Sequence, residues 1–191
     1  SAIAGLGAEL KTRNIKPSIL VNNAAFYGDM PGWGVPFEEE GLEAWLKVFQ
    51  VNAAAPFFLV QSLAGLLREQ ADPAVINVSS IYSLVGPDHR LYADTDMTNP
   101  CAYAASKSAL NQVTRWLATS LAPDIRVNTV TVGGIARGQP KSFVTAYESR
   151  TPLKRMARES DVSGAITFLA SDRASYITGQ NLAIDGGWTA W

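Results

Sequence analysis

The chain has 191 residues, of which 47% are hydrophobic and 17% are charged, a length and composition that fit one globular domain with a sizeable core. The 16 basic and 17 acidic side chains leave a net charge of -1, so the chain lacks the basic excess of proteins that bind nucleic acids or membrane surfaces. We therefore expect no nucleic-acid or membrane partner, and instead a small molecule or another copy of the chain.

The N-terminal segment is predicted to be a helix, because Ile3, Leu6 and Leu10 fall on one face. The pair Gly5-Leu-Gly7 lies inside this helix and precedes no predicted strand, so we do not expect a phosphate-binding loop there. The apolar run from Ile19 to Asn22 is typical of a first strand.

A long helix is predicted from about Glu43 to Glu69, with a bend at Pro56 because proline lacks the amide hydrogen that a helix interior needs. Asn52 and Gln61 interrupt its most apolar part, which argues against a membrane span of about 20 apolar residues. The second strand then runs from Val75 to Ser79.

The polar segment from Gly86 to Met97 is expected to be a surface loop. A second long helix should begin with Asn99 as its N-cap and Pro100 at the first helical position, where the missing N–H costs nothing. This helix runs to about Leu121, and the third strand spans Arg126 to Val130.

An irregular stretch from Gly133 to Ser142 leads into a helix that includes Phe143 to Ser149, and a last helix near Ser160 to Ser171 precedes the fourth strand, Leu182 to Asp185. Strands that alternate with helices indicate a parallel sheet covered on both faces. Because the strands show no polar alternation, they are expected to be buried on both faces. The predicted fold class is therefore α/β, with a doubly wound parallel sheet.

The single cysteine, Cys101, has no partner for an internal disulfide and is expected to be a small buried side chain. A lone cysteine is compatible with a reducing compartment, and the start of the chain shows neither the basic flank nor the apolar run of a signal peptide. We expect a cytoplasmic protein. Because a natural chain usually begins with Met, the initial Ser1 indicates a fragment.

Tyr103 and Lys107 are the first candidates for chemistry, because residues four apart share one face of a helix. An ammonium near a phenol favours the phenolate and lowers the tyrosine pKa from about 10 towards working pH. The phenol would then exchange a proton efficiently. Alone the pattern is weak, since this spacing arises by chance in many helices.

Polar residues at the carboxyl ends of predicted strands strengthen the pattern. Ser79 and Ser80 close the second strand, where a hydroxyl could reach a substrate carbonyl, although a serine pair at this place is more often a turn former. Asn22 and Asn23 follow the first strand, and Asn52 interrupts an apolar helix face. These amides could equally be structural groups with satisfied hydrogen bonds.

Together these segments resemble the short-chain dehydrogenase/reductase family, in family order and over nearly the whole chain. The matching segments are Asn22-Asn23-Ala24-Ala25, Asn52, Ser79-Ser80, Tyr103-Ala-Ala-Ser-Lys107, Ile125-Arg-Val-Asn128, Ile177-Thr-Gly-Gln180 and Asp185-Gly-Gly187. The resemblance implies a Rossmann-like single domain over residues 1–191.

The resemblance also implies roles for four residues. Tyr103 would be the general acid and base, Lys107 would lower its pKa and bind the nicotinamide ribose, and Ser80 would polarise the substrate carbonyl. Asn52 would position a water for proton relay. Ser80 is preferred over Ser79 because the family's catalytic hydroxyl usually occupies the second of the two places.

NAD or NADP is the cofactor that the resemblance implies. Asn22, Ala24 and Ala25 would line its adenosine side, and Gly133 and Ile135 would meet the nicotinamide end, together with the tyrosine and lysine named above. The protein would orient the cofactor, which itself carries the hydride.

The chain departs from the family pattern at its start, where the usual strand, glycine-rich turn and pyrophosphate-binding helix are not found. We therefore expect a partial domain that lacks the first strands of the family fold and binds dinucleotide poorly. Ala25 replaces a usual glycine, and Val132 a usual proline.

A longer segment than usual, Ile81 to Ala102, separates Ser80 from Tyr103. It is most simply a substrate loop, with Tyr82, His89 and Arg90 as candidate contacts, or else a solvated loop with no ligand.

The predicted function is NAD(P)-dependent interconversion of a secondary alcohol and a ketone on a small molecule. Closer likeness of Gly86-Pro-Asp88, Asn99-Pro100 and Asp185-Gly-Gly-Trp188 to the branch called flagellin modification protein A suggests a sugar-derived substrate for bacterial surface glycans. No His or Cys cluster indicates a metal. The alternatives are a catalytically silent fragment or scaffold that acts through oligomer assembly, and a dehydratase or epimerase that recycles its cofactor. The resemblance favours a homodimer or homotetramer.

Overall fold

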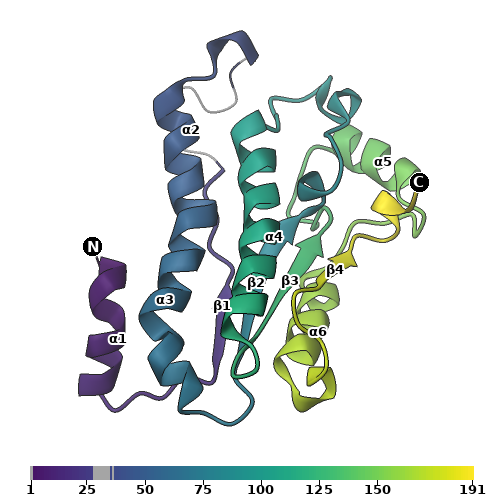
Figure 1. The fold of residues 1–191 in the computed structure, drawn as a ribbon. Coiled ribbons are helices and arrows are strands. Elements are labelled where there is room, and N and C mark those ends of the chain that lie inside the picture. Colours follow the sequence, from purple (N-terminus) through teal and green to yellow (C-terminus); the bar gives the residue numbers. More distant parts are fainter. Residues whose placement is uncertain (1, 28–34, 36) are drawn as a thin grey trace.

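The protein is described by a computed structural model over residues 2–27, 35 and 37–191, and these residues contain a four-stranded sheet (Figure 1). All neighbouring strands are parallel, in the order β1-β2-β3-β4. The strands are β1 (Ile19–Asn22), β2 (Ala74–Ser80), β3 (Arg126–Val132) and β4 (Asn181–Ile184). The four predicted strands are thus confirmed, with shifts of one or two residues at their ends. The expected burial on both faces holds for β2 and β3 but is wrong for β1, where Ile19 and Val21 are 45% and 39% exposed.

Six α-helices accompany the sheet in the described part of the chain. They are α1 (Ala2–Thr12), α2 (Leu42–Phe49), α3 (Ala55–Arg68), α4 (Cys101–Leu121), α5 (Lys141–Arg150) and α6 (Glu159–Ala170). Gly5 and Gly7 lie inside α1, as the sequence predicts, and a Cβ at Gly7 would come within 2.3 Å of the Ser62 carbonyl oxygen. Close packing of α1 on α3, rather than phosphate binding, accounts for that glycine.

Helices cover both faces of the sheet. Successive side chains of a strand point to opposite faces, so each strand contributes apolar residues to both layers of helices. On one face, Val75 and Val127 pack with α3 and α4 in a core that also takes Leu6 and Leu10 of α1. Figure 1 shows α1 alongside α3 on this side. On the other face, the next residues along β2 and β3, including Ile76, pack against α6. The doubly wound, Rossmann-like fold is therefore confirmed.

The long helix predicted between β1 and β2 is interrupted. A π-helical turn, Gln50–Ala54, separates α2 from α3. Pro56 is the second residue of α3, directly after this turn, and has no N–H to donate to the preceding helical turn. The irregularity thus begins six residues before Pro56 and contains Asn52, which the sequence did not predict, while the bend at Pro56 stays a prediction. π-Turns of this kind are frequent at functional sites.

The start of α4 also differs from the prediction. Pro100, and not Asn99, is the N-cap, and no side chain caps the helix. Cys101 is the first helical residue and is exposed rather than buried. A residue in the first helical turn has no preceding turn to cover it, and the Cys101 amide instead donates to the Glu40 carboxylate at 3.1 Å.

The helical segment Leu42–Arg68 is long and apolar enough to cross a membrane by length and composition, and 39% of its most apolar 18 residues are buried in the structure. Its buried residues belong to the core of the fold. Val60, Leu63 and Leu67 of α3 are at most 4% exposed and pack under the sheet. This packing accounts for the apolar residues on the buried face of α3.

Replacement of Leu67 by Ala should lower the free energy of unfolding by about 2–5 kcal/mol, because a fully buried leucine leaves a cavity that the core closes only in part. Leu67 has no exposed surface, whereas Leu42 at the start of α2 is 71% exposed. We expect Leu42→Ala to change the same quantity by no more than about 0.5 kcal/mol. Denaturant unfolding followed by circular dichroism measures both, and equal losses would contradict the packing described for α3.

Candidate active site

A cavity of about 530 Å³ opens beside Tyr103, at the carboxyl ends of β2 and β3. Ligands of open α/β sheets bind at this edge. We call it the Tyr103 cavity. Its described lining comes from the segment after β1, the end of β2, the start of α4 and the segment after β3. Three of the four residues expected to catalyse, namely Ser80, Tyr103 and Lys107, line it together.

Tyr103 and Lys107 lie one turn apart on α4, as their spacing predicts. The lysine Nζ is 5.8 Å from the centroid of the tyrosine ring and donates a hydrogen bond to the Val78 carbonyl oxygen at 2.8 Å. An ammonium carries three N–H groups, so two donors remain beyond this bond. The carbonyl thus holds the ammonium beside the phenol, at the end of β2.

Burial governs the ionisation of both groups. It lowers the pKa of the Lys107 ammonium to about 8, and it raises the pKa of the Tyr103 phenol. A hydrogen bond with Ser80 acts in the opposite direction on Tyr103, and the neighbouring Tyr27 phenol raises the pKa further. The expected lowering of the tyrosine pKa is therefore wrong in direction, because removal of the phenolate from water outweighs the favourable contacts.

The two serines that end β2 have different neighbours. The Ser79 hydroxyl donates to the Lys107 carbonyl oxygen at 3.3 Å. The Ser80 hydroxyl accepts a hydrogen bond from the Tyr82 amide at 3.3 Å and also meets the Tyr103 phenol. Only Ser80 therefore approaches the phenol, an arrangement consistent with the choice of Ser80 from the sequence.

Asn52 does not line the Tyr103 cavity. Its Oδ1 accepts from the Phe26 amide at 2.7 Å, and its Nδ2 donates to the Phe26 carbonyl at 3.0 Å and to the Ser106 hydroxyl at 3.1 Å. The amide thus ties the segment after β1 to α4. Its part in a proton relay stays a prediction. Its hydrogen bonds connect two elements that line the cavity.

The residues expected to bind cofactor divide into two groups. Ala24, Ala25, Gly133 and Ile135 line the Tyr103 cavity together with Tyr103 and Lys107. Asn22 does not, because its side chain is buried and its Nδ2 donates to Asn77 Oδ1 at 2.8 Å. The Asn22 side chain therefore has a structural partner, and its predicted contact with cofactor stays a prediction.

The Tyr103 cavity suits the nicotinamide and ribose half of a dinucleotide. Small residues leave room along its walls, since Ala24, Ala25 and Gly133 present at most one methyl group each. The described lining contains two cations, Lys107 and Arg137, and no carboxylate. Ribose hydroxyls would find donors in the N–H groups of Lys107 that Val78 leaves free, and an anionic ligand would meet no negative charge.

The three candidate substrate contacts lie outside this cavity. The Tyr82 hydroxyl forms a hydrogen bond with that of Tyr92 at 2.5 Å, and His89 and Arg90 are exposed in a 3-10 turn. Asp88 pairs with Arg90 and with Arg150 of α5, and the hydrogen bonds from Arg90, together with the positive charges of both arginines, hold the pKa of its carboxyl well below its usual range. The Asp88–Arg150 pair thus anchors the loop to α5, and the role of Tyr82, His89 and Arg90 in substrate binding stays a prediction.

Sequence reasoning missed several residues that line the Tyr103 cavity. Tyr27 lies edge-on to Tyr103, with ring centroids 6.3 Å apart. Thr98, Asn99 and Pro100 form the wall directly before α4. Their position a few residues before Tyr103 was the available signal. Arg137 and Gln139 complete the wall after β3.

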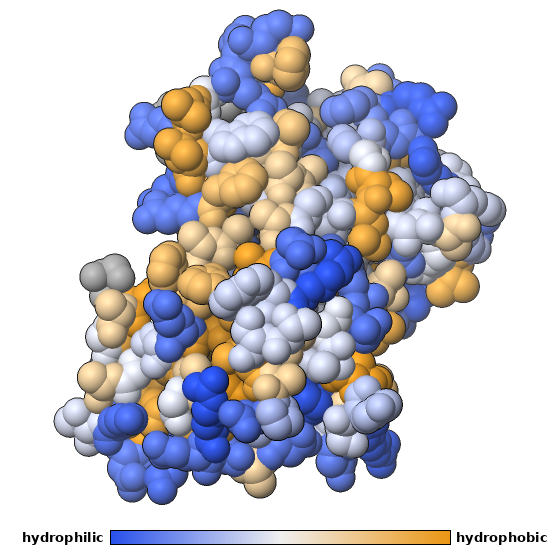
Figure 2. All heavy atoms as spheres, viewed as in Figure 1, coloured by the Kyte–Doolittle hydropathy of each residue, from blue (hydrophilic) through white to orange (hydrophobic). Residues whose placement is uncertain are grey.

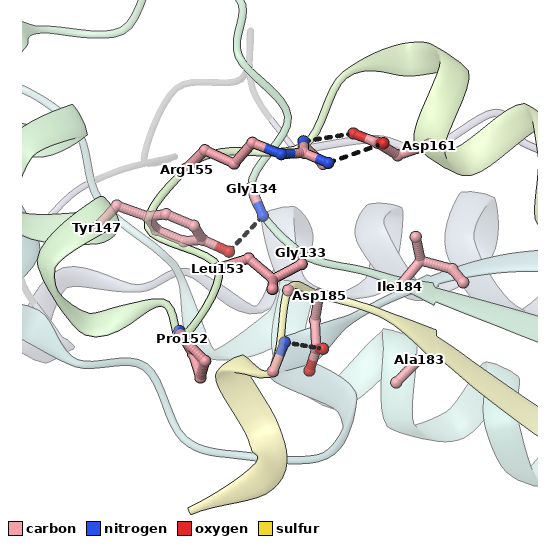
Figure 3. A pocket seen from close by; sticks show the side chains of 13 residues that line it. Gly133, Gly134, Tyr147, Pro152, Leu153, Arg155, Asp161, Ala183, Ile184 and Asp185 are labelled. Atoms are coloured by element: carbon pink, nitrogen blue, oxygen red, sulfur yellow. Dashed lines mark hydrogen bonds and ion pairs between the residues drawn. The ribbon is translucent and has the colours of Figure 1, made fainter.

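A second cavity of about 530 Å³ lies between the segment after β3, the α5–α6 turn and the end of β4 (Figure 3). Its polar groups have protein partners. The Tyr147 hydroxyl accepts from the Gly134 amide at 2.6 Å, Arg155 pairs with Asp161, and Asp185 accepts from the amide of Gly187. No group of three or more His, Cys, Asp or Glu side chains placed for a metal occurs among the described residues. The Tyr103 cavity therefore offers the richer chemistry.

Comparison with protein families and curated proteins gives consistent likenesses. A family model described as enoyl-(acyl carrier protein) reductase matches residues 1–189. The chain is 35% identical over 178 residues to cyclopentanol dehydrogenase of Comamonas sp., covering 90% of the chain and 65% of that protein. It is 30% identical over 158 residues to post-translational flagellin modification protein A of Campylobacter coli, covering 82% and 62%. The chain thus spans less than two thirds of the length of these relatives.

Among solved structures, a short-chain dehydrogenase of Leptospira borgpetersenii with bound NAD+ superposes with a TM-score of 0.88 and 36% identity. The match covers 98% of the present chain and 70% of that protein. The likeness therefore extends over β1 to β4 and over the helices that carry the Tyr103 cavity.

Proposed function

Because the chain belongs to the short-chain dehydrogenase/reductase family, we propose that the whole protein interconverts a secondary alcohol and a ketone with NAD or NADP. The observation that carries the proposal is the meeting of a phenol, an ammonium and a hydroxyl at the Tyr103 cavity. These groups supply a proton exchanger, a neighbouring positive charge and a hydrogen-bond donor for an oxygen.

In the proposed reaction, the Tyr103 hydroxyl exchanges a proton with the substrate oxygen. In ketone reduction the phenol donates its proton to the oxygen that becomes a hydroxyl, and in alcohol oxidation the phenolate accepts it. Ser80 donates a hydrogen bond to the same oxygen, and Lys107 stabilises the phenolate. When bound, the nicotinamide supplies or accepts the hydride.

Residues on two walls of the cavity would hold the dinucleotide. Lys107 would bind ribose hydroxyls with the N–H groups that Val78 leaves free. Gly133 has no room for a side chain, since a Cβ there would lie 2.8 Å from the Tyr147 hydroxyl. The backbone after β3 is thus fixed against α5, at the wall expected to meet the nicotinamide.

For the substrate, we infer a small molecule with a secondary hydroxyl or ketone, and as a finer proposal a sugar or sugar-derived molecule for bacterial surface glycans. The likeness to flagellin modification protein A supports the finer proposal. The likeness to cyclopentanol dehydrogenase supports the secondary alcohol without a sugar. Comparing turnover of sugar-derived and simple cyclic alcohols discriminates between them.

The pH dependence of kcat/KM tests the proposal. Ketone reduction needs Tyr103 protonated and Lys107 charged, so its rate should be constant at low pH and fall as pH rises through about 8. Alcohol oxidation needs the phenolate and should rise with pH. Lys107→Arg keeps the positive charge and should move the reductive decline to higher pH. A rate that stays flat from about pH 5 to 10 would contradict the assignment.

We propose a homodimer or homotetramer in the cytoplasm. Figure 2 shows apolar side chains gathered over α2 and α3. Among them Leu46 and Phe58 are 59% and 50% exposed, and Trp116 of α4 is 57% exposed. A groove of about 430 Å³ runs between these helices. An exposed apolar surface of this kind supports contact with a second copy of the chain.

A further inference from the structure

The side chain of Asn99 is buried in the wall of the Tyr103 cavity. It is 9% exposed and lies directly before α4, four residues ahead of Tyr103. Pro100, the next residue, favours an extended backbone at Asn99 and fixes φ at the start of the helix. The position of Asn99 relative to the proton-exchanging tyrosine is therefore set by the short connection to α4.

The Nδ2 of Asn99 donates no hydrogen bond to the described part of the fold. The residue also does not cap α4, whose N-cap is Pro100. The amide groups of Asn52 and the Nδ2 of Asn77, by contrast, donate to protein oxygens. Buried polar groups nearly always have a partner, so a donor without one at a cavity wall indicates that a ligand provides it.

The surroundings of Asn99 favour an oxygen atom as that partner. Tyr103 and Ser80 line the same cavity and would hold the reacting oxygen. The described lining includes Lys107 and Arg137 but no carboxylate. An oxygen with lone pairs, neutral or negatively charged, therefore meets donors on this wall and no repelling charge.

Resting on the proposed function, we infer that Asn99 determines substrate specificity by donating a hydrogen bond to a second oxygen of the substrate, near the reacting carbon. The corresponding substrates carry a hydroxyl, carbonyl or carboxylate next to the secondary alcohol. Vicinal diols, hydroxyketones and hydroxy acids share this chemistry. A site built around a polar donor rejects analogues that lack its partner, because the buried donor is then left unpaired.

The test compares matched substrates with the full-length natural protein. Cyclopentanol is paired with cyclopentane-1,2-diol, and 2-butanol with 2,3-butanediol and with 2-hydroxybutanoate. We expect the natural protein to show kcat/KM at least about 10-fold higher for the oxygenated member of a pair. Asn99→Ala should abolish this preference, so that the ratio of kcat/KM values within each pair falls to about 1. Each preference is the ratio of two kcat/KM values measured with the same preparation of one variant. A lower fraction of folded protein reduces both values equally and leaves the ratio unchanged.

Two further variants sharpen the test. Asn181 of β4 also has buried amide atoms without partners but does not line the cavity, so Asn181→Ala should keep the preference. Asn99→Asp replaces the donor by a carboxylate of the same shape. It should reduce turnover of 2-hydroxybutanoate more than that of the diols, because the two carboxylates repel each other. An equal reduction for both would place the second oxygen away from residue 99 and would overturn the specificity role.

Three outcomes decide the matter. A preference for the oxygenated members that disappears in Asn99→Ala supports the specificity role. Turnover of both members without preference, or a preference that Asn99→Ala retains, overturns this role while the proposed redox function stands. Failure to oxidise any substrate of the panel, and to reduce the corresponding ketones, with either NAD or NADP contradicts the proposed function itself and with it the specificity role.

Discussion

Replacement of Tyr103 by Phe in the full-length natural protein is expected to lower kcat/KM about 10²–10⁴-fold in both directions, the usual contribution of a positioned general acid or base. The variant keeps the ring that lies edge-on to Tyr27 and removes only the hydroxyl. Folding and cofactor binding should therefore change little. The effect should fall on kcat and kcat/KM alike, because the proton is transferred only in the reaction step.

The measurement follows the absorbance of reduced nicotinamide during turnover, with calorimetric titration of the dinucleotide alongside. Tyr176→Phe serves as the control, since this tyrosine is fully exposed and lies outside the cavity. Undiminished turnover by Tyr103→Phe would remove the phenol from the reaction and favour the alternative of a catalytically silent scaffold. Loss of dinucleotide binding would instead give the phenol a binding role.

The strands could be predicted from the sequence because their signal is local. Apolar runs such as Val75–Val78 are buried on both faces, and no neighbouring segment changes that preference. The break between α2 and α3 could not, since π-turn formation depends on what surrounds Asn52, whose amide bonds to Phe26 and to α4. A distant contact, invisible in the local pattern, fixes that turn.

The candidate site shows the same division. The spacing of Tyr103 and Lys107 places both at one cavity, because helix periodicity is a local property. The direction of the tyrosine pKa was predicted wrongly, since burial exists only in the folded chain. Arg90 of the loop was predicted to contact substrate, whereas in the structure it pairs with Asp88, which also pairs with Arg150 of α5. The sequence shows that the loop carries charged side chains, but it does not show which charged residue of another element each of them pairs with.

Replacement of Ser80 by Ala is expected to lower kcat/KM about 10²–10³-fold, the usual cost of removing one donor from a developing negative charge. The oxygen of the substrate gains charge as hydride is transferred, and the Ser80 hydroxyl lies against the phenol that exchanges the proton. The loss should fall mainly on kcat, because the bond strengthens in the transition state. Steady-state kinetics in both directions measure it.

A structural effect of Ser80→Ala can be separated from a catalytic one, because Ser80 also accepts a hydrogen bond from the Tyr82 amide. Ser80→Thr keeps the hydroxyl and should restore most of the activity. Ser108→Ala removes an exposed hydroxyl from α4, outside the cavity, and should leave kcat/KM unchanged. If Ser80→Ala loses thermal stability but retains kcat, the hydroxyl serves the turn after β2, and Tyr103 must then act on the substrate oxygen without it.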